Sequence, residues 1–414
     1  MVMSPGYKQT EVGVIPVDWD VAELGECLVA RPDYGINAPA VPYSDRLPMY
    51  IRITDITEDG GFSPDKLASV NAEYSDAYFL SDGDIVLART GASVGKSYRY
   101  KTTDGPLVFA GFLIRVKPDG TKLLPGYVAS YLKTGSYWRW VQLNSMRSGQ
   151  PGINGNEYAK LPLPLPPLPE QSAIATALSD VDALLSSLDA LIAKKRDIRQ
   201  AVMQQLLTGK TRLPGFEGEW TVKRLDQLAN IRSGGTPSTT VSRFWDGGIP
   251  WCTPTDITRL GGGKYLLDTS RQITSEGLSN SSAELIPANS VVMTSRATIG
   301  ECAINLKPVT TNQGFKNFVP FEDTDVNFLY YLLQTQKQGF MQLCAGSTFL
   351  EIGKTQLAAY KVHLPSTKAE QTAIAQVLSD MDVELAALEA RRDKTRLLKQ
   401  GMMQELLTGK TRLV

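Results

Sequence analysis

Histidine and cysteine are scarce in this 414-residue chain, which has one histidine, His363, and four cysteines. A single histidine excludes sites built from histidine pairs, such as two-histidine zinc enzymes and most phosphohydrolases. The cysteines are far apart in the sequence and form no CxxC pair: Cys27, Cys252, Cys302 and Cys344. We therefore expect reduced, buried thiols in a cytoplasmic protein, not a disulfide framework or a zinc site.

The chain also lacks net charge and long apolar runs. The 43 Lys and Arg residues balance 43 Asp and Glu residues, which excludes a protein that binds nucleic acid by bulk positive charge alone. No apolar run reaches the roughly 18 residues of a membrane helix, and the first residues have no signal-peptide core. We expect a soluble protein of two or three domains with no membrane contact.

The strongest pattern in the chain is an internal repeat. Residues 170–213 recur at 370–413 without a gap, and 25 of the 44 positions are identical. Weaker echoes precede each copy: TDIT at 54–57 and 255–258, RTGASVG (89–95) against SRATIG (295–300), and AGF (110–112) against QGF (313–315). The chain is thus predicted to be two copies of one unit, each a divergent globular part followed by a near-identical helix.

Both repeated segments have the periodicity of a coiled coil, because their apolar residues alternate at spacings of four and three. The seam positions are Ile174, Leu178, Val181, Leu185, Leu188 and Ile192, and then Ile374, Leu378, Met381, Leu385 and Leu388. Late in each copy the seam is interrupted, at Lys195 and Arg199, and at Arg392, Thr395 and Lys399. Since each helix follows a globular part, we expect antiparallel packing, a globular domain at each end, and chain ends that lie close together.

The globular parts contain strand-like segments at 84–89, 107–116 and 290–295. Loops rich in Gly, Ser and Thr separate these segments, as at 147–156 and 233–240. This pattern predicts mixed α/β (α+β) domains with hydroxyl, amide and Arg groups at the loop tips.

Catalytic motifs fail on spacing or context. GASVGKS (91–97) resembles a phosphate loop, but Thr90 stands where the first glycine is required. The two GKT triplets follow predicted helices, at the wrong end of the helix dipole for phosphate. Glu351 and Lys354 invite comparison with a nuclease, although such pairs arise by chance among 43 acidic residues. We predict a non-catalytic chain with no metal site and no cofactor of its own.

Arg, Lys, Thr, Ser, Asn and Gln in loops are the groups that hold DNA phosphates and read base edges. Candidates in the first globular part are Arg89, Thr90, Ser93, Lys96, Arg99, Asn144, Arg147 and Gln150. Candidates in the second are Ser233, Thr236, Thr240, Arg243, Arg296, Thr298, Asn312, Gln313 and Lys316. Each of these residues could equally be a solvated loop residue. The candidates are better supported as a group than one by one, because the loops RTGASVG (89–95) and SRATIG (295–300) occupy equivalent places in the repeat.

With these residues in view, the chain resembles the specificity (S) subunit of type I restriction-modification systems. The segment LPPLPEQSAIATALSDVDALL, the ending QQLLTGKTRL and their second copies carry the resemblance, together with the opening KQTEVGVIPVDWDVAEL. The resemblance covers the whole chain. It implies two target recognition domains separated by a long antiparallel coiled coil of two repeated helices with pseudo-two-fold symmetry. The implied boundaries are 1–160 and 214–365 for the domains, and 161–213 and 366–414 for the helices.

The resemblance also implies function and partners. Each domain would read one half of a bipartite, asymmetric site on double-stranded DNA. The helices would set the spacing and dock two methyltransferase (M) subunits, and motor-nuclease (R) subunits would complete the complex. AdoMet, ATP and Mg would then belong to the partner subunits. Two alternatives stay open: a specificity subunit that serves a fused restriction-methylation enzyme, and a protein scaffold without a DNA role.

Surface-type residues that repeat along with the seam predict where the M subunits bind. The residues proposed for this contact are Glu170, Gln171, Asp180, Asp182, Glu370, Gln371, Asp380 and Asp382. Recent duplication could also have preserved them. The globular parts are of the same age, however, and have diverged heavily.

Overall fold

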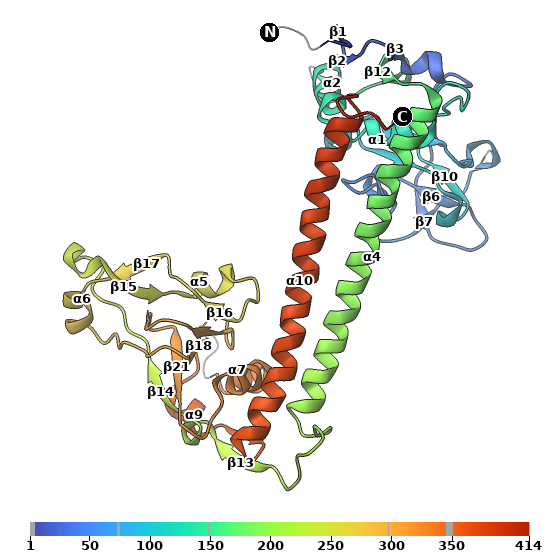
Figure 1. Ribbon diagram of the computed structural model, residues 1–414. Coiled ribbons are helices and arrows are strands. Elements are labelled where there is room, and N and C mark those ends of the chain that lie inside the picture. Colours follow the sequence, from blue (N-terminus) through green and yellow to red (C-terminus); the bar gives the residue numbers. More distant parts are fainter. Residues whose placement is uncertain (1–4, 73–74, 148, 297, 345–350, 414) are drawn as a thin grey trace. The chain divides into compact units, whose positions relative to one another are not determined.

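The computed structural model of the chain describes residues 5–72, 75–147, 149–296, 298–344 and 351–413. It divides into two compact units, unit 1 with Met1–Asp189 and Ala390–Val414, and unit 2 with Ala190–Glu389. The division falls within two helices of 39 residues, α4 (Leu168–Leu206) and α10 (Lys368–Leu406), so each unit holds part of both (Figure 1). Both helices lie inside the predicted ranges 161–213 and 366–414.

Among its described residues, the globular part of unit 1 has four small sheets. Their strand orders are β1-β2, β10-β6-β7-β5, β4-β11-β8-β9 and β12-β3. The strands are β1 (Tyr7–Thr10), β2 (Gly13–Pro16), β3 (Asp20–Glu23), β4 (Asp33–Tyr34), β5 (Val41–Pro42), β6 (Met49–Ile51), β7 (Ala68–Ser69), β8 (Ile85–Ala88), β9 (Ser97–Arg99), β10 (Leu107–Phe109), β11 (Leu113–Val116) and β12 (Pro162–Leu165). The helices are α1 (Pro125–Tyr131), α2 (Gly135–Ser145) and α3 (Gly155–Ala159).

Unit 2 has a globular part of the same kind. Its sheets are β13-β22, β14-β21-β18-β19-β16 and β17-β15-β20. The strands are β13 (Thr221–Arg224), β14 (Ala229–Ser233), β15 (Trp245–Cys252), β16 (Tyr265–Leu266), β17 (Arg271–Ile273), β18 (Ser290–Thr294), β19 (Cys302–Asn305), β20 (Thr310–Thr311), β21 (Phe315–Pro320) and β22 (Lys361–Leu364). The helices are α5 (Pro254–Arg259), α6 (Ser275–Ser279), α7 (Val326–Thr335), α8 (Lys337–Gln342) and α9 (Lys354–Ala359). The predicted mixed α/β class is confirmed, as are the strands expected near 84–89, 107–116 and 290–295.

The predicted apolar seam is buried at the start of each helix, where Ile174, Leu178, Ile374 and Leu378 are at most 2% exposed. Further along, Leu188 and Ile192 are also buried, whereas the other predicted seam residues are half-buried: Val181, Leu185, Met381, Leu385 and Leu388. The four residues at the helix starts belong to the two largest hydrophobic cores, one in each unit. The helices are therefore part of the domain cores and not only a connection between them.

The charged residues that interrupt the seam pair with acids on the other helix. In unit 1, Lys399 Nζ lies 2.6 Å from Asp182 Oδ1. In unit 2, Lys195 Nζ lies 2.7 Å from Glu384 Oε1, and Arg199 pairs with Asp382. Each pair joins a late position on one helix to an early position on the other, so the helices are antiparallel within each unit. The interruptions are explained by this pairing.

A buried glutamate joins the start of each helix to the tail of the other. We call this contact of a glutamate with a tryptophan and an arginine the joint. In unit 1, Glu170 accepts a hydrogen bond from Trp19 Nε1 at 2.9 Å and two from Arg412, at 2.6 Å from Nε and 2.7 Å from Nη2. Arg412 also donates two hydrogen bonds to Asp18. The hydrogen bonds to Glu170 and Asp18 raise the pKa of Arg412 above its ordinary value.

In unit 2 the same joint is made by Glu370, Trp220 and Arg212. The next residue of each helix anchors the globular part, since Gln171 accepts from the Leu124 amide at 2.8 Å and Gln371 from the Asp325 amide at 3.0 Å.

These joints correct one expectation. Four of the residues predicted as surface contacts for a partner are at most 3% exposed: Glu170, Gln171, Glu370 and Gln371. They repeat because each unit uses them internally to hold its helix start, its globular part and the tail of the other helix. Burial leaves no side-chain surface on these four residues for a partner subunit.

The described ends of the chain lie together in unit 1. The Tyr7 hydroxyl donates to the Gly409 carbonyl at 3.1 Å. A Cβ on Gly409 would lie 2.5 Å from the Pro16 ring, so glycine is required for this close approach. The predicted proximity of the two ends is confirmed. Among the described helices, none is long and apolar enough to cross a membrane.

Candidate nucleic-acid interface

Two loops of unit 1 lie side by side beyond the end of β8. Thr90 forms a β-bridge with Gly152, and the Ile153 amide donates to the Arg89 carbonyl at 2.9 Å. The Gln150 side chain covers Gly91, where a Cβ would lie 2.9 Å from Gln150 Nε2. Gly91 also has a φ of +73°, so any other residue would be strained there. The fold thus brings the predicted residues Arg89, Thr90 and Gln150 together.

Side chains around these loops are held by local contacts. The Arg89 guanidinium lies 5.0 Å from the centre of the Tyr34 ring, in cation–π geometry. Arg147 Nη2 pairs with Glu157 Oε1 at 2.5 Å, and Asn144 Nδ2 donates to a backbone carbonyl at 2.8 Å. Tyr34 and Glu157 were not predicted, because local spacing shows neither the packing of Tyr34 on the distant Arg89 nor the pairing of Glu157 with Arg147.

Unit 2 repeats this backbone arrangement. The Ser295 amide donates to the Gly314 carbonyl, as the Arg89 amide does to the Phe112 carbonyl. Gly95 and Gly300 close the two loops with φ of +90° and +83°. The predicted equivalence of RTGASVG with SRATIG is therefore confirmed. The predicted match of AGF (110–112) with QGF (313–315) is wrong by one residue, because the backbone hydrogen bonds place Phe112 at the position of Gly314 and Leu113 at that of Phe315.

The second cluster of polar side chains lies at this equivalent place in unit 2. Ser233 is opposite Lys316 across β14 and β21, and the Thr236 hydroxyl donates to Gln313 Oε1. Asn312 Oδ1 accepts from the Gly314 amide at 2.9 Å. Two short loops and the end of a sheet thus place Ser233, Thr236, Asn312 and Gln313 near one another.

An acidic residue, Glu351, lies between two cations of this cluster. Its carboxylate is 2.9 Å from Arg296 Nη2 and 3.8 Å from Lys316 Nζ. Burial lowers the pKa of Lys316, and Glu351 opposes this shift. The sequence pointed to Glu351 only as a neighbour of Lys354, because its true partners are distant in the chain.

The loop 233–240 is held by aromatic residues. Trp245 Nε1 donates to the Ser238 carbonyl at 3.1 Å and Trp251 Nε1 to the Gly235 carbonyl at 3.0 Å. The Arg271 guanidinium lies 3.9 Å from the centre of the Trp245 ring. These contacts fix the backbone from which Ser233, Thr236 and Thr240 project.

Five predicted residues lie outside the two clusters or at their edge. Lys96 pairs with Glu58 at 2.6 Å and lines a cavity of about 400 Å³ together with α4 and α10, and Arg99 lines a smaller cavity beside it. Both face the helices and not the loops. In unit 2, Thr240 contacts Ser238, Arg243 pairs with Glu276 at 2.7 Å, and the Thr298 carbonyl accepts from Thr294.

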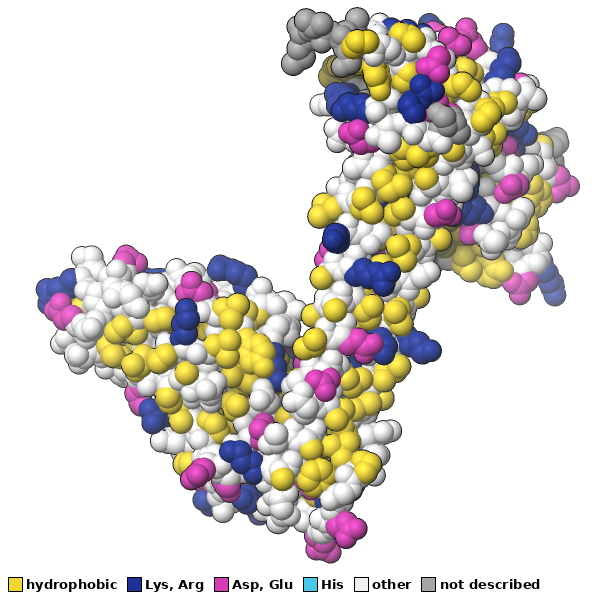
Figure 2. All heavy atoms as spheres, viewed as in Figure 1, with side chains coloured by type: hydrophobic (Ala, Val, Ile, Leu, Met, Phe, Trp, Pro, Cys, Tyr) yellow, Lys and Arg dark blue, Asp and Glu magenta, His cyan; other side chains and the backbone are white. Residues whose placement is uncertain are grey.

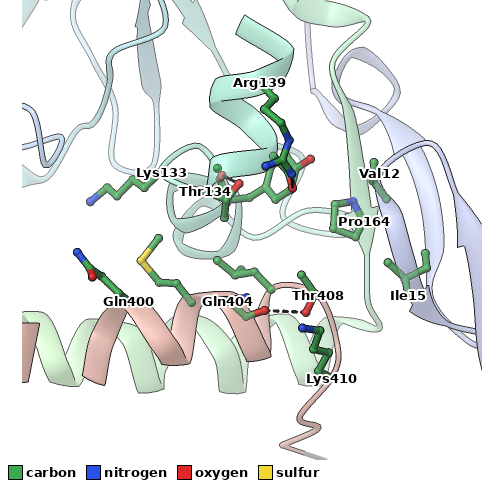
Figure 3. A pocket seen from close by; sticks show the side chains of 15 residues that line it. Val12, Ile15, Lys133, Thr134, Arg139, Pro164, Gln400, Gln404, Thr408 and Lys410 are labelled. Atoms are coloured by element: carbon green, nitrogen blue, oxygen red, sulfur yellow. Dashed lines mark hydrogen bonds between the residues drawn. The ribbon is translucent and has the colours of Figure 1, made fainter. Parts of the chain in front are cut away.

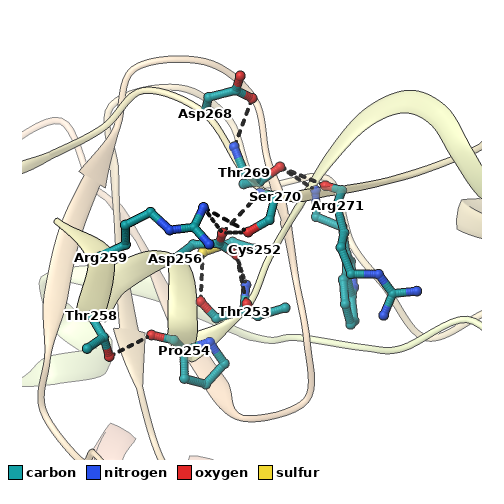
Figure 4. Close-up of polar contacts among 11 residues, drawn as sticks. Cys252, Thr253, Pro254, Asp256, Thr258, Arg259, Asp268, Thr269, Ser270 and Arg271 are labelled. Carbon is teal, nitrogen blue, oxygen red and sulfur yellow. Dashed lines mark hydrogen bonds and ion pairs between the residues drawn. The ribbon is translucent and has the colours of Figure 1, made fainter.

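The repeated TDIT motif has a structural role. Asp256 Oδ2 accepts from the Thr253 amide at 2.8 Å and Oδ1 accepts from the Ser270 amide at 3.0 Å (Figure 4). Burial acts to raise the pKa of Asp256, but hydrogen bonds from Ser270 and Thr253 outweigh it and lower the pKa. Its counterpart Asp55 accepts from the Arg52 amide at 2.8 Å. Both aspartates tie a strand end to the turn that follows it.

A pair of matching cavities lies beside the last turns of the helices. In unit 1 a cavity of about 440 Å³ lies between α10 and the start of α2, with Lys133, Thr134, Gln400 and Gln404 around it (Figure 3). In unit 2 a cavity of about 600 Å³ is lined by Gln200, Met203, Gln204 and Thr335. Three helix positions line both cavities and are identical between the repeats: Gln200 and Gln400, Met203 and Met403, and Gln204 and Gln404. Arg199 of α4 also lines the cavity of unit 2.

Surface charge is mixed. On the face visible in Figure 2, basic and acidic side chains alternate over both units without a large continuous basic area. This agrees with the zero net charge of the chain.

Comparison with known proteins gives consistent results. The family model described as "Type I restriction modification DNA specificity domain" matches residues 16–194 and 217–397. The type I restriction enzyme MjaIX specificity subunit of Methanocaldococcus jannaschii is 36% identical over 166 residues, 40% of this chain and 38% of that protein. The EcoR124I/EcoR124II specificity subunit of Escherichia coli is 30% identical over 243 residues, 56% of this chain and 57% of that protein.

Other similarities span nearly the whole chain. The putative MjaX specificity subunit of M. jannaschii is 24% identical over 428 aligned residues, which cover 98% of this chain and 97% of that protein. The crystal structure of the HsdS subunit from Thermoanaerobacter tengcongensis has a TM-score of 0.52 at 18% identity, covering 96% of this chain and 98% of that one. The S subunit from M. genitalium has a TM-score of 0.60 at 15% identity, covering 98% and 99%. At these identities the two structures show a shared fold.

Proposed function

The chain belongs to the family of type I restriction-modification specificity subunits, and from this premise we propose that each unit reads one half of a bipartite, asymmetric DNA site. The observation that carries the proposal is the pair of loop clusters at equivalent places in the two units. Their backbones correspond, through Arg89 and Ser295 and through Ile153 and Ile352, while their side chains differ. Two readers built alike but with different side chains suit two different half-sites.

The helices are proposed to set the distance between the half-sites. Each has 39 residues, or about 58 Å at 1.5 Å per residue. That length corresponds to about 17 base pairs at about 3.4 Å each, enough for two readers in successive major grooves. Under this proposal the two helices act as a ruler between the domains.

The helices are also proposed to dock two methyltransferase subunits, one per unit. The two matching cavities support this, because identical helix residues line them in both units. Asp180 and Asp380 remain candidates for this contact, since both are exposed. Asp182 and Asp382 are already paired with Lys399 and Arg199 and are weaker candidates.

The chain is proposed to act without catalysis of its own. Methylation with AdoMet, ATP hydrolysis with Mg and cleavage would be carried out by the methyltransferase and motor-nuclease subunits. A neutral surface fits this role, because non-specific affinity for DNA can come from those partners.

Long-read methylation sequencing tests the proposed function. A methylation-free host would express this chain and its methyltransferase subunit together, and a second strain would express the methyltransferase alone. We expect a bipartite methylated motif only in the first strain. Methylation of the same motif without this chain, or none with it, would contradict the proposal. A host that carries the chain alone provides the control.

A further inference from the structure

Unit 2 contains three charged residues linked by two ion pairs, and the last of them lies in its loop cluster. Lys316, on β21, is only 6% exposed in its side chain, and its ammonium lies 3.8 Å from Glu351. Glu351 in turn pairs with Arg296, whose side chain is 44% exposed. A buried cation therefore anchors a carboxylate, and the carboxylate anchors an exposed guanidinium.

The backbone fixes the positions of two of these residues, Glu351 and Arg296. Arg296 and Glu351 face each other in a β-bridge, so their side chains leave from adjacent points. The Ile352 amide donates to the Ser295 carbonyl at 3.1 Å beside the bridge. The aliphatic stem of Arg296 passes Gly314, where a Cβ would lie 3.9 Å from Arg296 Cδ. The guanidinium thus has support from the bridge, from Gly314 and from Glu351.

We propose that Arg296 reads a guanine in the major groove of the half-site bound by unit 2, and that Glu351 is the positioning residue that orients it. This proposal rests on the proposed function. A guanidinium has five N–H donors, and one carboxylate can occupy at most two of them. The remaining donors can make the bidentate contact to guanine O6 and N7, the commonest specific contact of arginine with DNA.

A phosphate contact explains the arrangement less well. The Glu351 carboxylate would repel a phosphate brought against Arg296, whereas the guanine edge carries acceptors without a full negative charge. Pre-orientation by a fixed carboxylate also reduces the entropy lost when the base is bound. In unit 1 the equivalent positions hold Thr90 and Gly152. An arginine oriented by a carboxylate is therefore proposed for the half-site of unit 2 only.

The test is a competitive selection from randomised DNA by the complex of this chain with its methyltransferase subunit. For Arg296→Ala we expect a loss of about 10- to 100-fold in preference for one G·C pair, confined to one half-site. For Arg296→Lys we expect a smaller loss, because an ammonium keeps the charge and can still donate to guanine but lacks the rigid planar fork of the guanidinium. For Glu351→Gln we expect a smaller loss at the same pair.

The outcomes distinguish failure of guanine reading by Arg296 from failure of the proposed function. If Arg296→Ala keeps the full sequence preference, or if its affinity for all sequences falls equally while the preference stays, guanine reading by Arg296 is overturned. If the wild-type complex selects no bipartite sequence, the proposed function itself fails.

Thermal unfolding and co-purification of the methyltransferase should be unchanged in the variants, which excludes loss of fold or assembly as the cause. Arg224→Ala is the matched control, since Arg224 forms an ion pair of 3.0 Å with Asp226 at β13. It should leave every position of the selected sequence unchanged.

Discussion

The two units use the same joint but have different side chains in their loop clusters. At the joint, Glu170 and Glu370 each hold a tryptophan and the arginine of a helix tail. In the loop clusters, the β-bridge between Thr90 and Gly152 of unit 1 corresponds in position to the β-bridge between Arg296 and Glu351 of unit 2. The joint is alike because its two glutamates are buried and hydrogen-bonded, so a change to either glutamate leaves a tryptophan and an arginine without that partner. Loop side chains carry no such constraint and can diverge.

This difference gives the repeat a physical reason. The near-identity of residues 170–213 and 370–413 includes Glu and Gln positions that are buried within their own units and Arg positions that pair with the buried glutamates. Internal packing is therefore sufficient to explain part of the repeat. Repeated residues that stay exposed or line the matching cavities, such as Asp180, Gln204 and their counterparts, are the ones that require another explanation.

The largest expected effect comes from lengthening the helices that both units share. Inserting one heptad in each helix, after Asp189 and after Glu389, adds about 10 Å at 1.5 Å per residue. The spacer of the methylated motif should grow by about three base pairs at about 3.4 Å each, while both half-site sequences stay the same. Methylation sequencing measures the spacer. An unchanged spacer would contradict the role of the helices as a ruler.

The next effect is on stability, at the joint. Glu170→Ala should lower the free energy of unfolding by about 2–4 kcal/mol, because it leaves Trp19 and Arg412 without a buried partner. Glu370→Ala should cost less, since Trp220 is only half-buried and its bond is longer, 3.3 Å against 2.9 Å. Urea unfolding measures both. Glu11→Ala, at an exposed position, is the control. Equal losses at the three positions would show that the joint does not stabilise the units.

A smaller effect separates the two readers. Gln150→Ala should reduce base discrimination by about 1–3 kcal/mol in one half-site, and Gln313→Ala by a similar amount in the other. The double variant should combine the two losses additively, because the residues belong to different units. Binding to single-base variants of the site provides the measurement. Effects of both variants on the same half-site would refute the assignment of one half-site to each unit.

The smallest effect is on the pH dependence of unit 2. Hydrogen bonds from Ser270 and Thr253 outweigh burial and hold the pKa of Asp256 below its ordinary value of 3.8. A folded-state pKa below the unfolded one means that the stabilisation is fully present above about pH 4 and is lost as the pH falls further. Asp256→Asn should therefore destabilise the chain near pH 7 and flatten its acid unfolding curve. An acid curve identical to that of the wild type would contradict this role.

Periodicity and self-comparison were enough to predict the repeat, the seam of the helices and the equivalence of the loops. Each of these depends on regular spacing, which local sequence displays directly. The seam interruptions at Lys195 and Arg199 were also visible. Their partners Glu384 and Asp382 were not, because the register between two antiparallel helices depends on long-range packing.

The loop residues were predicted as a group and sorted only by the fold. Arg89, Thr90 and Gln150 come together in unit 1, whereas Lys96 and Arg99 lie in cavities beside the helices. A basic residue a few positions away can face the opposite side of a strand, so composition alone does not separate them. Glu351 was noticed beside Lys354, but its ion pairs with Arg296 and Lys316 join strands far apart in the chain.

The sequence by itself determined that this chain is a duplicated, charge-neutral protein of the specificity-subunit family, with two 44-residue segments sharing 25 identities. Composition, spacing and repetition are properties of the linear chain. The tertiary structure decided which repeated polar residues are buried, as at Glu170 and Glu370, and which charges support one another, as from Lys316 through Glu351 to Arg296. Burial and ion pairing depend on distances between segments far apart in sequence, and only folding sets those distances.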